Sequence, residues 1–160
     1  MTIAVGDKIP DVELRRMGKR EPETLGSLDV LGHGKVVIFG VPGAFTPTCS
    51  DFHLPGFIVR AEDLKSKGVD LVACVAVNDA YVMGAWGVAQ GAGDAVMMLA
   101  DGNGEFTREL GLESDKTAAG LGMRSQRYAM VLEDGIVTYL GVETEPGVSV
   151  SGADAVLAAV

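Results

Sequence analysis

The sequence predicts an α/β fold, because apolar runs typical of buried strands alternate with segments typical of helices. Two runs carry this prediction: Lys35–Gly40 and Leu71–Val77 are apolar almost throughout, without the alternation of a half-exposed strand. That pattern is typical of central strands covered on both faces of a sheet. A β-hairpin follows nearer the C-terminus, where Asp134-Gly135 separates two further apolar runs. The chain is therefore expected to form a sheet flanked by helices.

Local patterns place the other elements. Residues 1–34 are expected to form an irregular N-terminal extension with one short strand at Ile9–Leu14. A helix is expected to start at Thr46-Pro47, to kink or break at Pro55-Gly56, and then to resume and end at a glycine cap, Gly68. The remaining expected elements are a helix capped by Asn78-Asp79 and ended by Gly91–Asp94, a strand at Val96–Ala100, a helix at Glu105–Leu110, hairpin strands at Arg127–Glu133 and Ile136–Leu140, and a C-terminal helix over Ser151–Val160.

Length and composition limit the classes of protein to which the chain can belong. Its 160 residues suit a single domain, 1–160, with a sizeable core, and a hydrophobic content of 48% argues against disorder. The formal charge of −9, from 13 basic and 22 acidic residues, makes nucleic acid and anionic membranes unsuitable partners. No apolar run reaches the length that spans a membrane.

The cysteine content and the N-terminus predict a cellular compartment. Two cysteines in a chain of this length do not make a disulfide framework. The first residues lack the basic and apolar regions of a secretory signal. A reducing, cytoplasmic environment is therefore expected, although a removed organellar targeting peptide would leave no trace.

The most informative segment is Val41–Cys49, the loop that follows the first buried strand. Thr46 suits the N-cap of a helix and Pro47 its first position, so Cys49 falls in the first helical turn. Free N–H groups and the positive end of the helix dipole favour a thiolate there. Most free cysteines are inert core residues, but a Gly/Pro-shaped loop after a buried strand is where α/β folds place reactive groups. Cys49 is therefore the candidate nucleophile.

The same loop carries a resemblance to a known family. It reads PGAFTPTCS from Pro42 to Ser50, with Pro42, Thr46 and Cys49 in the spacing Pro-x-x-x-Thr-x-x-Cys, and it resembles the peroxidatic loop of the type II peroxiredoxins. The resemblance covers nearly the whole chain and continues, in the same order, through His53–Phe57, Ser66–Asp70, Val77–Met83 and Gly120–Ala129.

This resemblance implies both a fold and an activity. The fold would be thioredoxin-like, with a central mixed sheet flanked by helices and an N-terminal extension. The activity would be that of a thiol peroxidase that reduces hydrogen peroxide and alkyl hydroperoxides through a sulfenic acid on Cys49. A homodimer is also implied, with the loops around Cys49 near the contact.

Arg127 matches the arginine that the family carries at the start of the hairpin strand. Ala129 and Val131 share its strand face, so its side chain is expected to point into apolar surroundings, where a guanidinium needs an anion. The Cys49 thiolate would be that anion. Arg124, three residues earlier, competes for this role and is expected instead to support Arg127 or the loop.

Two loop residues complete the set of candidates. Thr46 is expected to orient the peroxide and the thiolate through its hydroxyl, although a plain N-cap explains it equally well from the residues alone. Pro42 has no N–H and fixes the loop, so it can screen the thiolate and the sulfenic acid.

Other chemistries have weaker support. His53 stands four residues after Cys49, which makes a Cys–His hydrolase formally possible, but no oxyanion-hole or nucleophile-elbow motif accompanies it. We interpret His53 as an exposed helical histidine. A zinc site built from the cysteines and from His33 and His53 lacks any recognised ligand spacing, so neither a metal nor a cofactor is expected. No cysteine lies three residues from Cys49, which excludes a thioredoxin-type disulfide exchanger.

The reductant depends on Cys74, the only other cysteine. Plant members of type II resemble this chain in carrying a cysteine here, whereas residues 147–151 lack the resolving cysteine that some members carry near the C-terminus. Cys74 lies within an apolar run, and a disulfide with Cys49 would require a central strand to open. We therefore expect glutathione, recycled by glutaredoxin, to reduce Cys49. Thioredoxin with Cys74 as the resolving cysteine is the alternative.

A different class of function also remains open. A redox-sensing thiol protein would keep the fold without efficient turnover. Such a protein would tolerate the loss of at least one candidate residue, and this chain keeps all of Pro42, Thr46, Cys49 and Arg127. The enzyme is therefore the favoured interpretation.

Overall fold

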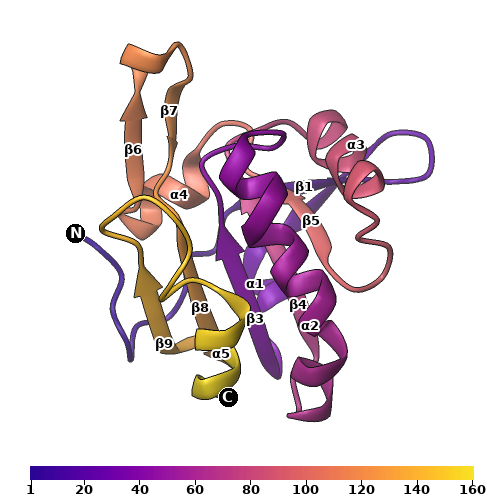
Figure 1. The fold of residues 1–160 in the computed structure, drawn as a ribbon, viewed down its shortest axis with the longest axis vertical. Coiled ribbons are helices and arrows are strands. Elements are labelled where there is room, and N and C mark those ends of the chain that lie inside the picture. The colour runs from indigo at the N-terminus through magenta and orange to yellow at the C-terminus, as the bar shows by residue number, and fades with distance from the viewer.

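A seven-stranded mixed sheet forms the centre of the molecule in the computed structural model, which describes residues 1–160 (Figure 1). Its strands are β1 (Glu13–Met17), β2 (Pro22–Gly26), β3 (Lys35–Gly40), β4 (Leu71–Ala76), β5 (Met97–Ala100), β8 (Tyr128–Glu133) and β9 (Ile136–Val142). They lie in the order β2-β1-β5-β4-β3-β8-β9. The central strands β3, β4 and β5 are parallel, and the strands on either side of them pair antiparallel.

A second, smaller sheet and seven helical segments complete the chain. The hairpin of β6 (Glu113–Lys116) and β7 (Gly122–Ser125) stands away from the body of the molecule (Figure 1). The helical segments are α1 (Ser27–Leu31), the π turn η1 (Cys49–His53), α2 (Leu54–Ser66), α3 (Ala80–Gln90), α4 (Glu105–Leu110), the 3₁₀ turn η2 (Thr117–Ala119) and α5 (Ala153–Ala159).

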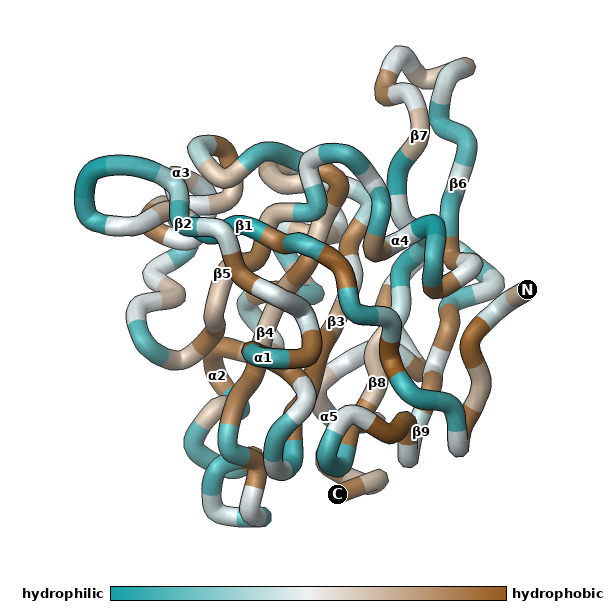
Figure 2. The backbone as a smooth tube through the Cα atoms, turned by 180° about the vertical axis from the view of Figure 1, so that it is seen from behind, coloured by the Kyte–Doolittle hydropathy of each residue, from teal (hydrophilic) through white to brown (hydrophobic).

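Two hydrophobic clusters cover the two faces of the sheet. Helices α2, α3 and α5 pack on one face, and α1, α4 and the N-terminal segment pack on the other. Along β4, Cys74 belongs to the first cluster while its neighbours Ala73 and Val75 belong to the second. Figure 2 shows hydrophobic stretches concentrated in the central strands and hydrophilic ones in outer loops such as the β1–β2 turn. The absence of alternation in the central strands therefore reflects burial on both faces.

Several local predictions are confirmed. β3 and α4 have the predicted bounds, and Asp79 caps α3 by accepting a hydrogen bond from the N–H of Val82 at 2.9 Å. The turn between β8 and β9 places Asp134 at φ 49° and Gly135 at φ 82°. Two successive positive φ angles match the right-handed twist of the strands, which explains the Asp-Gly pair.

The N-terminal region is more regular than predicted. The first strand spans Glu13–Met17 instead of Ile9–Leu14, and both β2 and α1 were missed. β1 and β2 pair along their whole length at the edge of the sheet. An edge strand keeps polar side chains in water and is held by its backbone pairing, so its sequence carries little apolar signal.

The helix after the loop starts near Pro47, as predicted, but it does not break at Pro55. Instead the chain widens into the π turn η1, where the N–H of Leu54 donates to the carbonyl of Cys49, five residues earlier. Pro55 then occupies the first turn of α2, where its missing N–H loses little.

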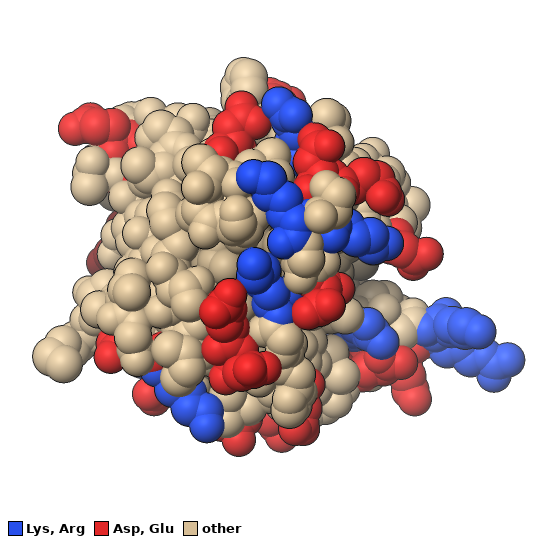
Figure 3. Space-filling model, turned by 90° about the horizontal axis from the view of Figure 1, so that it is seen from below, with Lys and Arg blue, Asp and Glu red and all other residues tan.

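The surface shows no concentration of one charge on the face drawn in Figure 3, where basic side chains are interspersed with acidic ones. None of the helices combines the length and the hydropathy that crossing a membrane requires.

Candidate active site

The loop between β3 and η1 is anchored to the neighbouring strand and helix. The N–H of Ala44 donates to Oδ1 of Asn78 at 2.9 Å, which ties the loop to the end of β4. Nε1 of Trp86 in α3 donates to Oγ of Ser50 at 3.0 Å. Cys49 lies between these anchors in the first helical turn, and its side chain is fully buried in the cluster beneath α2.

Strand register brings Arg127 to Cys49. Tyr128 pairs with Gly40, the last residue of β3, so Arg127 lies just beyond that strand, beside the loop. The ring of Tyr128 occupies the space where a Cβ of residue 40 would stand, which explains the glycine. Arg127 faces the same side as Ala129, and its Nη2 donates to Sγ of Cys49 at 3.0 Å. A guanidinium at hydrogen-bond distance stabilises a thiolate relative to a thiol.

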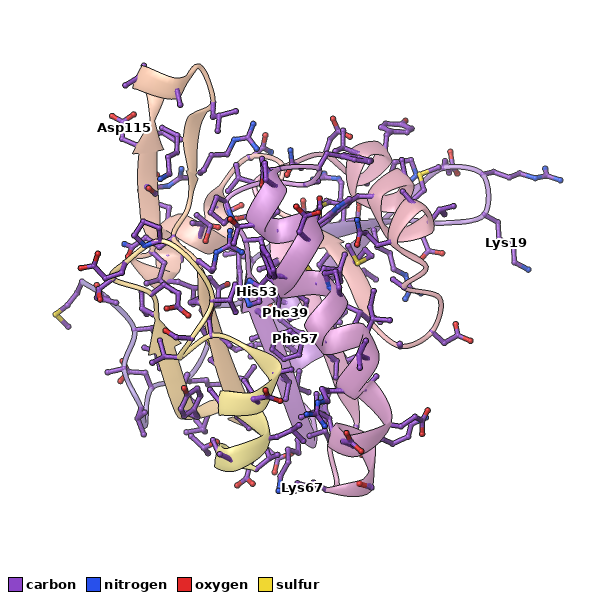
Figure 4. All side chains as sticks on the ribbon, in the orientation of Figure 1. Lys19, Phe39, His53, Phe57, Lys67 and Asp115 are labelled. Carbon is purple, nitrogen blue, oxygen red and sulfur yellow. The ribbon has the colours of Figure 1, made fainter.

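The prediction that His53 is an exposed histidine is wrong, because the side chain is buried. Only 1% of it is exposed, and its ring lies against Phe39 and Phe57, with centroid distances of 4.9 and 5.6 Å (Figure 4). Nδ1 of His53 lies 2.9 Å from Nη1 of Arg127, and Nε2 lies 2.8 Å from the carbonyl oxygen of Ser151. Residues four apart in a helix lie on the same face, so His53 points into the core on the same side as Phe57.

The tautomer of His53 follows from these contacts. A carbonyl can only accept, so Nε2 carries the proton and donates to Ser151, and Nδ1 accepts from Arg127. Burial lowers the pKa of His53 to about 3. The hydrogen bond to Ser151, the second-largest effect, and the charge of Glu143 oppose this shift, and the positive charge of Arg127 adds to it. The neutral imidazole is therefore an acceptor for Arg127 and carries no competing positive charge at neutral pH.

Glu143 holds the segment that supplies the Ser151 carbonyl. Its carboxylate accepts hydrogen bonds from the N–H and Oγ of Ser149 and from the N–H and Oγ of Ser151, at 2.6 to 2.8 Å. Partial burial raises the pKa of Glu143, but these four hydrogen bonds outweigh that effect and hold it at about 2. No spacing or motif pointed to Glu143 or Ser151, because they meet His53 only through the fold.

The other candidate residues form hydrogen bonds with backbone carbonyls. Oγ1 of Thr46 donates to the carbonyl of Gly43 at 2.7 Å, so it can face a bound peroxide only through its acceptor lone pairs. Arg124 reaches the carbonyl of Pro42 with Nη1 at 3.4 Å and that of Leu121 with Nε at 2.9 Å. Arg124 therefore contacts the loop, and Arg127 contacts the sulfur.

Cys74 lies at the centre of the sheet, where its β4 position pairs with Phe39 of β3 and Met98 of β5. The thiol is fully buried and forms no disulfide with Cys49. Burial raises the pKa of Cys74 well above the ordinary value, and the neighbouring Cys49 raises it further. A protonated thiol in this position is a poor nucleophile.

No group of three or more histidine, cysteine, aspartate or glutamate side chains lies close enough together to hold a metal ion. The chemistry that the site supports is that of a buried sulfur beside a fixed guanidinium. Such a pair suits a nucleophilic thiolate and the negative charge that develops when it attacks.

Comparisons with known proteins agree with this geometry. A model of the Redoxin family matches residues 4–157. The chain is 49% identical to peroxiredoxin-2B of Arabidopsis thaliana over 158 residues, 98% of each protein. It is 50% identical to the chloroplastic peroxiredoxin-2E-2 of Oryza sativa subsp. japonica over 163 residues, which cover 99% of this chain and 72% of the relative.

The chain belongs to the type II peroxiredoxins. The structure of reduced Prx3 from Vibrio vulnificus in complex with hydrogen peroxide covers 99% of both chains at 51% identity, with a TM-score of 0.94. The thioredoxin-like fold expected from the sequence is thereby confirmed for this peroxiredoxin, and the thiol peroxidase activity of its family is its general function. In this peroxiredoxin, Cys49, Arg127 and His53 form one hydrogen-bonded row.

Proposed function

We propose that this peroxiredoxin reduces hydrogen peroxide and alkyl hydroperoxides with Cys49 as the nucleophile and an external thiol as the reductant. The contact that carries the proposal is the hydrogen bond of 3.0 Å from Nη2 of Arg127 to Sγ of Cys49. It fixes a positive charge at the atom that must become and remain a thiolate.

The oxidation step is a displacement at oxygen. The Cys49 thiolate attacks the terminal oxygen of the peroxide, a sulfur–oxygen bond forms and the oxygen–oxygen bond breaks. Sulfur loses two electrons and becomes a sulfenic acid, and the departing hydroxide or alkoxide takes a proton from solvent. Arg127 lies where it can stabilise the charge on the reacting oxygens, and Thr46 offers an acceptor for the proton of the peroxide.

We propose glutathione, recycled by glutaredoxin, as the reductant. One glutathione thiol displaces water from the sulfenic acid and forms a mixed disulfide with Cys49. A second thiol, from glutaredoxin or from another glutathione, releases Cys49 as a thiol. The burial of Cys74 in the central strand β4, with its pKa raised by that burial, supports an external thiol over an internal one. Thioredoxin with Cys74 as the resolving cysteine is the competing route.

Intact-mass analysis after one equivalent of peroxide separates the two routes. External reduction predicts one added oxygen without thiol, and one added glutathione when glutathione is present. Loss of two hydrogens with a tryptic Cys49–Cys74 link would show the internal disulfide and refute the proposal for the reductant. Peroxide consumption with glutathione and glutaredoxin, compared with thioredoxin, then identifies the electron donor.

We also propose that the protein is a homodimer in a reducing compartment, the cytoplasm. Three exposed aromatic residues lie on the loop, on η1 and on α3: Phe45 is 56%, Phe52 67% and Tyr81 64% exposed. Phe45 also holds a positive φ of 64°, an unfavourable conformation for a bulky residue. Aromatic residues on a surface are typical of protein contacts, which supports a second copy as the partner near Cys49.

A further inference from the structure

A polar cleft of about 530 Å³ opens in front of Arg127. The β6–β7 hairpin forms one wall and residues 143–147 form the other; Figure 1 shows these two segments flanking the end of β8. None of its thirteen lining residues carries an aliphatic or aromatic side chain, apart from the rings of Pro42 and Pro146. Ligand sites in proteins are mostly apolar with a few polar groups, so this composition is unusual.

The cleft is lined by the arginine that contacts the reactive sulfur. Pro42 and Thr48 line it together with Arg127, whose guanidinium is hydrogen-bonded to Sγ of Cys49. A peroxide that approaches along this cleft therefore meets the guanidinium and then the sulfur. Its substituent, when it has one, must lie between the hairpin and the loop.

Charged side chains line both walls of the cleft. Lys116 of the hairpin and Glu113 and Glu145 of the walls form no ion pair with another side chain. A hydrocarbon group placed among them would bury little apolar surface and would displace water from charged groups. Because little apolar surface is buried, the usual hydrophobic gain is missing, and the removal of water from charged groups opposes binding.

We infer that this cleft makes the enzyme selective for small, polar hydroperoxides, with hydrogen peroxide first, and disfavours those with bulky apolar substituents. The inference rests on the proposed function, since it assumes attack by Cys49 on a peroxide. The chemical step is the same for every substrate, with the oxygen–oxygen bond broken and the hydroxide or alkoxide released into the cleft. Selectivity between peroxides therefore depends on how well the cleft accommodates the substituent of the peroxide while Cys49 attacks.

The test is the second-order rate of Cys49 oxidation by three peroxides: hydrogen peroxide, tert-butyl hydroperoxide and cumene hydroperoxide. We expect the rate to fall in that order, with hydrogen peroxide about tenfold or more faster than cumene hydroperoxide, the scale on which pocket contacts discriminate apolar groups. Rapid oxidation by hydrogen peroxide with equal or faster oxidation by cumene hydroperoxide would overturn this inference and leave the proposed function standing. Failure of all three peroxides to oxidise Cys49 would overturn both.

Two variants assign the selectivity to the cleft. Lys116→Leu on the hairpin and Thr144→Leu on the opposite wall each supply the apolar surface that the cleft lacks. Each should lower the ratio of the hydrogen peroxide rate to the cumene hydroperoxide rate several-fold, and either variant suffices if the other fails to fold. The matched control is Lys19→Leu, because Lys19 is exposed on the β1–β2 turn, far from the hairpin (Figure 4). An unchanged ratio in the folded cleft variants, or an equal change in the control, would refute the assignment.

Discussion

Nη1 of Arg127 lies 2.9 Å from Nδ1 of His53, and this hydrogen bond fixes the guanidinium of Arg127 in the plane from which it reaches Cys49. His53 is in turn held by the Ser151 carbonyl at 2.8 Å. The orientation of Arg127 is therefore established before a substrate binds. Preorganised donors of this kind need little rearrangement during the reaction, which is why they are effective.

Cys49→Ser should abolish peroxide reduction, because an alcohol at this position is far less nucleophilic than a thiolate. Cys74→Ala is the matched control and should keep most of the turnover with glutathione and glutaredoxin. Some stability should be lost in the control, since Cys74 is fully buried. Peroxide consumption is the measurement, and undiminished consumption by Cys49→Ser would falsify the assignment of the nucleophile.

Arg127→Gln should lower the rate constant for peroxide by about a hundredfold, the scale of losing one stabiliser of a developing oxyanion. Folding should survive, as circular dichroism would show. Arg124→Gln is the control, with a smaller loss expected because Arg124 contacts only backbone carbonyls. Stopped-flow oxidation of both variants decides between the arginines; a silent Arg127→Gln beside a damaging Arg124→Gln would reverse the assignment.

His53→Leu should slow oxidation of Cys49 by about tenfold or more, because the guanidinium of Arg127 loses its acceptor and its fixed orientation. His53→Asn is the matched variant, since its amide oxygen stands near the place of Nδ1 and can accept from Arg127. We expect it to recover part of the rate. Equal rates in the wild type and in His53→Leu would show that His53 has no positioning role.

The free energy of unfolding should fall as the pH drops below about 6.5, because His53 is buried in its neutral form. The pKa of His53 is about 3 in the folded protein and 6.5 as the reference value, so over that interval the unfolded chain binds a proton that the folded one does not. The loss amounts to about 1.4 kcal/mol for each pH unit, or about 2 kcal/mol by pH 5. Glu143, with a pKa of about 2, acts in the same direction but only at pH values below its ordinary 4.5.

Urea unfolding at pH 7 and at about pH 5 measures this loss, and His53→Leu is the control because it removes the titrating group. The wild type should lose about 2 kcal/mol more than the variant between these two conditions. Identical pH dependence in the two proteins would contradict the assignment of a low pKa to His53.

Sedimentation should find a dimer at micromolar concentration. Phe45→Ser and Phe52→Ser remove exposed aromatic rings and should shift the equilibrium towards monomer without unfolding the chain. Val88→Ser is the control, because Val88 is 84% exposed near the C-terminal end of α3, on a different element from the loop and η1. A monomeric wild type in both redox states would remove the dimer from the proposal.

Much of the architecture could be predicted from local patterns. The central strands were recognisable because double burial demands uninterrupted apolar runs, and caps such as Asp79 and turns such as Asp134-Gly135 obey strong local rules. The hairpin β6–β7 was missed because it lies outside the main sheet and has no apolar face to bury. Such a hairpin is defined only by the hydrogen bonds between its two strands, and the pattern of neighbouring residues does not show which strands will pair.

The sequence by itself determined the α/β class, the place of Cys49 after β3 and, through the spacing of Pro42, Thr46 and Cys49, the family. The inward position of His53 was within its reach, since His53 and Phe57 share a helix face. Only the tertiary structure decided which atoms meet: Arg127 lies 78 residues from Cys49 and 74 from His53 along the chain, and Ser151 lies 98 residues from His53. Strand register and helix packing set those contacts, and both arise from the burial of the whole core at once.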